Sequence, residues 1–264
     1  MTLNGDGRNT ELSLIEMVET LRKEYGRLMS SQVFNAADMD YGLLERHRPM
    51  LAQMARMCGS VVSIFDMCAR RHVFTSCNFS DLFGRQTDVE EMEVRMHPDD
   101  VLHLWQHAVS AFRYALACRT DVADCKFIVE YRISNASGRY VRVIEQQSVL
   151  ESDRAGNVWL VLSVLDLSPD QSPLKAVKFG VFRKKDSSAV SIPGLPAGNM
   201  AGLSPREIEI LQMVGDGMLS KEISDRLYIS VHTVNTHRQR ILEKLNVDNS
   251  MEAVKYASAL GLLK

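Results

Sequence analysis

The side chains best suited to chemistry lie in residues 230–246 of the 264-residue chain. Asn235 and Gln239 carry amides, which both donate and accept hydrogen bonds, and Arg238 and Arg240 carry guanidinium groups that bind phosphate oxygens. Apolar side chains recur at helical spacing on the other side of the segment, at Val234, Ile241 and Leu245. A helix of this kind can rest its apolar side on a small core and place its polar side in a groove of DNA.

The surrounding residues predict the helices that would hold this segment. Ser204-Pro-Arg-Glu207 has the form of a capping box with proline at the first helical position, and Gly215-Asp-Gly217 would end that helix. Ser220 is expected to cap a short second helix, and Ser230 to cap the third. Asn249, three residues before Glu252, opens a fourth. Two short helices joined by a tight turn, the second one polar outside, form a helix-turn-helix.

At this point the chain resembles the LuxR-type (NarL-type) DNA-binding domain over its last quarter. The matching residues are Leu203-Ser-Pro-Arg-Glu-Ile-Glu-Ile-Leu211, Gly217, Ser220-Lys-Glu-Ile223, Leu227, Ile229-Ser230, Thr233-Val234, His237, Lys244-Leu245, Val247 and Glu252-Ala253. The resemblance implies four helices, of which the third enters the major groove and the fourth usually dimerises.

The resemblance also implies roles for individual side chains. It places the base-reading residues at Asn235, Thr236 and Gln239. It places the phosphate-contacting residues at Lys221, Thr233, His237, Arg238, Arg240 and Lys244. Asn235 stands where many members carry lysine, and because amides pair bidentately with adenine, we expect half-sites rich in A·T.

Charge counting supports a competing interpretation, an ordinary solvated helical bundle. Residues 202–264 hold eight basic and eight acidic side chains, so bulk attraction to DNA is absent. The third helix nevertheless contains three basic residues, Arg238, Arg240 and Lys244, and only one acidic residue, Glu243. This local excess of positive charge favours DNA binding.

Composition limits the remaining classes of function. The net charge of −2 argues against a general polyanion binder, and the N-terminal residues lack the apolar core of a signal peptide. Five scattered cysteines without a CxxC spacing indicate free thiols of a reducing cytoplasm. We find no catalytic constellation, phosphate-binding glycine loop or metal-ligand cluster, and we expect neither an enzyme nor a bound cofactor.

Residues 58–169 are similar to a PAS domain. Two strands (61–67 and 71–77) precede short helices and a long helix from Pro98, and three strands (126–134, 140–150 and 158–167) follow. The matching phrases are Asn78-Phe-Ser-Asp-Leu-Phe-Gly84, Met96-His-Pro-Asp-Asp100 and Glu130-Tyr-Arg-Ile133. PAS domains sense small molecules, light or redox state, or simply dimerise.

Glu145 and Gln147 are the candidate residues for lining a ligand cavity, because they alternate with Val141 and Val143 on one strand. An edge or dimer-facing sheet would explain the same alternation. His103 and His107 have a spacing that could hold a metal, but we expect them to be solvated because they lie opposite the apolar stripe of their helix.

The two remaining segments connect or flank these domains. Residues 1–57 are expected to be helical, with seams at Leu14, Val18, Leu21, Tyr25 and Leu28, and at Leu43, His47, Met50, Met54 and Met57. Pro49 should break or start a helix. Dimerisation and docking on the sensor are both open for this segment. Residues 170–201 are expected to be a linker, part of which could instead be a short strand docking on the sensor.

The sequence therefore predicts an α+β protein: an N-terminal helical segment (1–57), a PAS-like five-stranded antiparallel sheet with helices (58–169), a linker (170–201) and an all-α four-helix domain (202–264). We interpret it as a cytoplasmic, homodimeric bacterial-type transcription regulator that binds double-stranded DNA. An unknown small molecule and RNA polymerase are further candidate partners, and no membrane is expected. The alternative is a constitutive DNA-binding protein whose PAS-like domain only mediates protein contacts.

Overall fold

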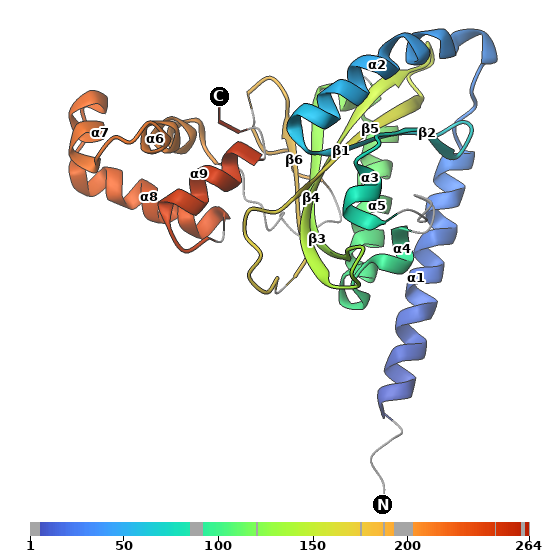
Figure 1. Ribbon diagram of the computed structural model, residues 1–264, viewed down its shortest axis with the longest axis horizontal. Helices are drawn as coiled ribbons and strands as arrows, with labels where there is room; N and C mark the ends of the chain where they lie inside the picture. Colours follow the sequence, from blue (N-terminus) through green and yellow to red (C-terminus); the bar gives the residue numbers. More distant parts are fainter. Residues whose placement is uncertain are drawn as a thin grey trace, which may run out of the picture.

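The computed structural model describes residues 6–84, 92–119, 121–174, 176–186, 188–192, 203–245, 247–259 and 262–263. A sheet covered by helices forms the N-terminal part, and a group of helices forms the C-terminal part beside the β3–β6 side of that sheet (Figure 1). Among the described helices, none is long and apolar enough to cross a membrane.

The sheet is antiparallel and has the strand order β2-β1-β5-β4-β3-β6. Its strands are β1 (Val61–Asp66), β2 (Arg71–Thr75), β3 (Cys125–Ser134), β4 (Tyr140–Ser152), β5 (Val158–Leu167) and β6 (Lys178–Arg183). The predicted PAS-like order of two strands, helices and three strands is confirmed. The predicted number of strands was wrong, because β6 pairs with β3 and adds a sixth strand from the stretch expected to be a linker. The sequence left this short strand open as an alternative for part of residues 170–201.

The inner face of the sheet is covered by α3 (Phe79–Phe83) and α5 (Pro98–Ala117), and the short helix α4 (Met92–Arg95) lies between them in the chain. Alternate residues of the strands point to this face, and Tyr131, Ile133 and Val143 pack there with Phe79 and Phe83. A short 3-10 turn, Val122–Asp124, leads from α5 into β3.

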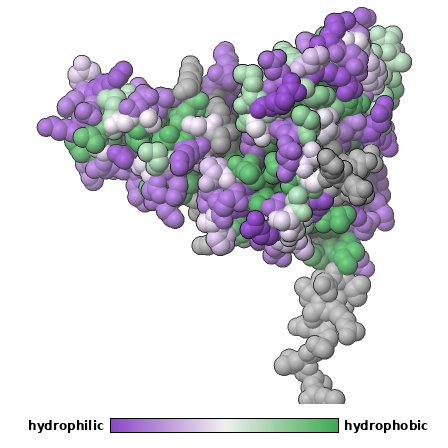
Figure 2. Space-filling view, in the orientation of Figure 1, coloured by the Kyte–Doolittle hydropathy of each residue, from purple (hydrophilic) through white to green (hydrophobic). Residues whose placement is uncertain are grey.

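Helix α1 (Asp6–Ser30) docks along α5. The ring of Tyr25 lies 5.7 Å from Trp105 and 5.3 Å from Phe112, measured between centroids. Docking on α5 therefore accounts for the C-terminal half of the predicted seam. The seam does not stay buried toward the N-terminus, because Leu14 is 39% exposed. With Ile15 and Met17 it forms a hydrophobic patch where α1 leaves the sensor (Figure 2).

Helix α2 (Tyr41–Cys58) covers the outer face of the sheet over β1 and β5, after a 3-10 turn at Ala36–Asp38. Its buried residues are Leu44, Leu51 and Ala55, one position away from the predicted seam, whose Met50, Met54 and Met57 are exposed. Pro49 lies inside the helix and does not break it. The apolar contacts of this helix with the sheet offset the hydrogen bond that proline cannot donate.

The C-terminal part contains the four predicted helices, α6 (Pro205–Gly215), α7 (Ser220–Leu227), α8 (Val231–Leu245) and α9 (Ser250–Ala259). Their common core includes Ile210, Leu211, Ile223, Val234 and Ile241. This core is continuous with Ile128, Ile144 and Phe182, which lie on the outer face of the sheet. The C-terminal helices and α2 therefore share the outer face, with α2 over β1 and β5 and the C-terminal helices over β3, β4 and β6.

Candidate nucleic-acid interface

The capping box predicted at the start of α6 is confirmed. Ser204 Oγ accepts a hydrogen bond from the Glu207 amide at 3.3 Å, and the Ser204 amide donates to Glu207 Oε2 at 2.6 Å. Lys244 Nζ on α8 donates to the same oxygen at 2.6 Å. Burial raises the pKa of Glu207, but the hydrogen bonds from Lys244 and Ser204 outweigh it, and the net pKa lies below the ordinary value. The first and third helices are thus joined by a charged contact.

Side-chain hydrogen bonds fix the start of each helix of the helix-turn-helix. Helix α7 begins after Leu219, whose amide donates to Glu222 Oε2 at 2.7 Å. The prediction that Ser220 caps this helix was wrong, because Ser220 is its first residue. Tyr228 ends α7 in the left-handed conformation, with φ of 54°. Ser230 Oγ then accepts the Thr233 amide at 3.0 Å and caps α8, as predicted.

The residues predicted to read bases lie on the outer side of α8. Asn235 and Gln239 are exposed one helical turn apart, and Gln239 donates to Glu243 at 3.2 Å. Thr236 is half-buried, and its hydroxyl donates to the His232 carbonyl at 3.0 Å. The opposite side of the helix, at Val234, Ile241 and Leu245, is buried in the domain core. Hydrophilic side chains dominate the visible face of these C-terminal helices (Figure 2).

The residues predicted to contact phosphates divide into two groups. Lys221 and Arg240 are exposed, and the Thr233 hydroxyl lies 2.8 Å from Ser230 Oγ near the start of α8. Arg238, by contrast, is half-buried, and Lys244 is held by Glu207. His237 is also half-buried, and its Nδ1 has no hydrogen-bond partner among the described residues.

Arg238 has an internal role that sequence reasoning missed. Its guanidinium donates to Ser220 Oγ at 2.9 Å and to Ser250 Oγ at 3.0 Å, which joins α8 to the first residues of α7 and α9. A sequence signal existed, because Arg238 lies four residues after Val234 and three before Ile241, on the buried side of the helix. Spacing alone could therefore have separated Arg238 from Arg240.

On the sensor, the structure brings Glu145 and Gln147 together on the inner face of the sheet. Glu145 accepts hydrogen bonds from Gln147 at 2.9 Å, from Ser163 at 2.6 Å and from Tyr131 at 3.1 Å. Its carboxylate is thus the centre of a polar cluster on a face that is otherwise mainly apolar. Within the described part of the chain, no group of metal-ligating side chains gathers.

The two histidines of α5 differ from each other. His103 is exposed, as expected, whereas His107 stacks on Phe179 with ring centroids 4.5 Å apart. Burial, followed by repulsion from His103, lowers the pKa of His107 to about 4. The expectation of a solvated histidine was therefore wrong for His107, because β6 adds Phe179 to this side of the sensor.

A capped, four-helix domain that presents amide and guanidinium groups from the outer side of its third helix is a helix-turn-helix DNA-binding domain. Residues 201–257 match the family of bacterial regulatory proteins called the luxR family, so the chain carries a LuxR-type domain at this end. The oxygen regulatory protein NreC of Staphylococcus carnosus is 44% identical over 61 residues, which cover 23% of this chain and 28% of NreC. The positive transcription regulator BvgA of Bordetella pertussis is 33% identical over 89 residues, which cover 34% of this chain and 38% of BvgA. The chain thus spans well under half the length of these relatives.

Two solved structures resemble larger parts of the chain. The phage VqmA–DPO complex aligns with 83% of this chain and 91% of its own, at 16% identity and a TM-score of 0.31. The PAS sensor domain of a diguanylate cyclase from Marinobacter aquaeolei aligns with 41% of this chain and 94% of its own, at 16% identity and a TM-score of 0.31. TM-scores this low assign no function, and the functional assignment rests on the C-terminal domain.

Proposed function

We propose that the protein is a sequence-specific transcription regulator that binds double-stranded DNA as a homodimer. The observation that carries this proposal is the exposed polar side of α8, held in place by capped neighbours, within the segment that matches the luxR family. Two copies would place two α8 helices in major-groove half-sites about ten base pairs apart. The protein then acts in the cytoplasm, where RNA polymerase is a further candidate partner.

In this proposal the exposed side chains of α8 divide the work. Asn235 and Gln239 hydrogen-bond base edges with their amides, with a preference for adenine, and Thr236 lies between them. Arg240, Lys221 and the Thr233 hydroxyl contact phosphates and set the orientation of the helix. Arg238 and Lys244 support α8 through their contacts with Ser220 and Glu207. The half-buried His237 lies at the edge of this surface as a further phosphate-contacting candidate.

The PAS-like sheet would control this DNA binding. The polar cluster around Glu145 supports a small polar ligand on the inner face of the sheet, and a population shift between orientations of the domains would then change the DNA affinity. Native mass spectrometry of the purified protein tests the ligand directly. A measured mass equal to that of the chain, or of its dimer, with no added ligand would favour the alternative in which the domain mediates only protein contacts.

DNA binding is tested by selection of binding sites from random duplexes, followed by salt titration of the full chain. Replacing Arg240 by Ala should weaken binding to every sequence and lower the salt slope by about one, because one phosphate contact is lost. Replacing Gln239 by Ala should mainly relax the preference at one base pair, by about 1–3 kcal/mol.

Arg240 is chosen over Arg238 because the contacts of Arg238 with Ser220 and Ser250 would mix DNA binding with domain stability. The matched control is Arg56→Ala, which removes an exposed arginine of α2 and should change neither quantity. Failure of the wild-type chain to select any sequence would overturn the proposal. Equal losses on all sequences for both α8 variants would overturn the division of roles.

A further inference from the structure

A buried carboxylate connects the sheet to the C-terminal helices. Glu130 of β3 is fully buried on the outer face, and its Oε1 accepts hydrogen bonds from Arg142 at 2.5 and 3.0 Å and from Ser168 at 2.7 Å. Its Oε2 accepts the hydroxyl of Tyr256 on α9 at 2.8 Å, across the boundary between the two parts of the protein. One side chain of the sensor thus hydrogen-bonds the DNA-binding domain directly.

The charges around Glu130 are balanced. Arg142 donates to Asp170 at 2.5 Å as well as to Glu130, and Lys178 Nζ lies 3.5 Å from Glu130, so two carboxylates meet two cations. Burial and the neighbouring Glu130 raise the pKa of Tyr256 well above its ordinary value, which keeps the hydroxyl protonated as a donor. Buried ion pairs of this kind add little net stability but require one geometry.

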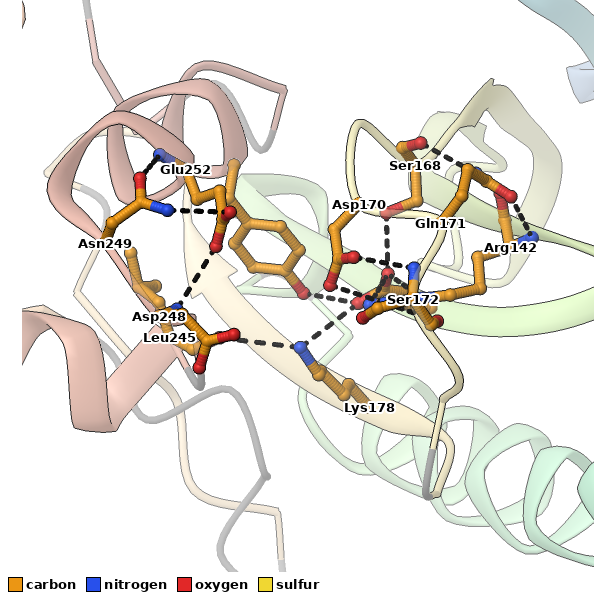
Figure 3. A network of polar contacts seen from close by, with 12 residues as sticks. Arg142, Ser168, Asp170, Gln171, Ser172, Lys178, Leu245, Asp248, Asn249 and Glu252 are labelled. Carbon is orange, nitrogen blue, oxygen red and sulfur yellow. Dashed lines mark hydrogen bonds and ion pairs between the residues drawn. The ribbon is translucent and has the colours of Figure 1, made fainter.

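Lys178 of β6 makes the second contact across the boundary (Figure 3). Its Nζ donates to the carbonyl of Leu245, the last residue of α8, at 3.4 Å, and lies 4.9 Å from the centroid of the Tyr256 ring. A cation at this position meets the negative end of the helix dipole and an unsatisfied terminal carbonyl. The sensor therefore holds the C-terminal end of the very helix that carries the reading residues.

The docked arrangement leaves the reading side of α8 open. The contact uses Tyr256 and the end of α8, with Ile128, Ile144 and Phe182 packed around it, whereas Asn235 and Gln239 remain exposed. The contact therefore fixes the direction in which α8 points from the sheet and does not cover its polar side.

We propose that Glu130, Lys178 and Tyr256 form an interdomain latch that positions α8 relative to the PAS-like sheet for paired half-sites. The latch is a positioning device: its residues do not touch DNA but set where the reading side of α8 lies. Its part in DNA recognition rests on the proposed function, whereas the latch itself is a property of the free chain.

The latch is tested by acylating the lysines of the full chain with an N-hydroxysuccinimide acetate and following each site by mass spectrometry. Lys178 is 5% exposed when docked, and Lys255, exposed on α9, serves as the internal standard. Tyr256→Phe keeps the ring and removes only the hydroxyl. Because the docked state then loses one hydrogen bond to a charged group, the undocked state should become more populated, and Lys178 should be labelled about 10- to 100-fold faster.

The matched control is Tyr228→Phe, the same change at a side chain that is 94% exposed, and it should leave the labelling of Lys178 unchanged. Glu130→Gln is the second variant and should act in the same direction as Tyr256→Phe. The latch is refuted if Lys178 reacts as fast as Lys255 in the wild type, or if Tyr256→Phe, folded by circular dichroism, labels at the wild-type rate.

A DNA readout separates positioning from mere stability. With half-sites set at a series of spacings, the wild type should favour one spacing, whereas Tyr256→Phe should bind all of them with more similar affinities. An unchanged spacing profile would refute the positioning role. If the wild type binds no DNA, the proposed function fails, but the labelling experiment still judges the latch.

Discussion

His107 illustrates how a single side chain can make stability depend on pH. Its ring is stacked on Phe179, and burial lowers its pKa to about 4, against an ordinary value of 6.5. Between these two values the unfolded chain binds more protons than the folded chain. The free energy of unfolding therefore carries no penalty from His107 above pH 6.5, and it decreases as the pH falls from 6.5 toward 4.

We expect His107→Gln to remove that pH dependence. Chemical denaturation measures the free energy of unfolding at pH 7 and at pH 4.5. Between these pH values the free energy of unfolding of the wild type should fall by up to about 3 kcal/mol more than that of the variant, since each pKa unit corresponds to about 1.4 kcal/mol. His47→Gln, at an exposed histidine of α2 that does not contribute to the pKa shift of His107, is the control and should follow the wild type. Parallel pH profiles for the wild type and His107→Gln would contradict the assignment.

Residue-level prediction from the sequence succeeded where the partner is close in the chain. Ser204 and Glu207, or Ser230 and Thr233, are three residues apart, and local rules identify them. Glu130 and Tyr256 are 126 residues apart, and strand alternation shows only that Glu130 lies on one face of the sheet. The latch thus depends on how the two domains pack against each other. The local sequence patterns around Glu130 and Tyr256 carry no information about that packing.

At the scale of elements, α2 shows that packing can outweigh a helix breaker. Pro49 lies in its interior, yet the helix runs from Tyr41 to Cys58 because Leu44, Leu51 and Ala55 pack on the sheet. The periodicity of the methionines predicted the helix correctly but its buried side wrongly. Similarly, β6 was predicted only as an alternative, because the prolines and serines that flank it are typical of a linker, whereas its pairing partner β3 is distant in the sequence.

Pro49→Ala should therefore stabilise the PAS-like domain. Alanine restores the missing amide donor and is about 3 kcal/mol better than proline in a helix interior, so we expect the free energy of unfolding to rise by about 1–3 kcal/mol. Urea denaturation followed by circular dichroism measures the change. His47→Ala, at an exposed position of the same helix, should alter stability by no more than about 0.5 kcal/mol. A loss of stability in Pro49→Ala would mean that the proline relieves strain in this helix.

At the scale of the whole molecule, the two domains share one core. Ile128, Ile144 and Phe182 of the sheet belong to the same apolar cluster as Ile210 and Ile241 of the C-terminal helices. Two domains joined only by a linker would unfold independently, whereas a shared core and a buried ionic latch couple them. Under the proposed function, this coupling gives the PAS-like sheet a physical route to α8 without any contact between a ligand and DNA.

Calorimetry of the full chain tests this coupling, with two substitutions on the same face of the sheet. The wild type should unfold in one transition. Ile144→Ala removes a fully buried side chain beneath the C-terminal helices and should split the transition in two, in addition to a loss of about 2–5 kcal/mol. Leu160→Ala makes a comparable cavity beneath α2 and should lower the melting temperature of the single transition without splitting it. Two well-separated transitions in the wild type would show that the shared core does not couple the domains, and a signal at the sheet would then need another path to α8.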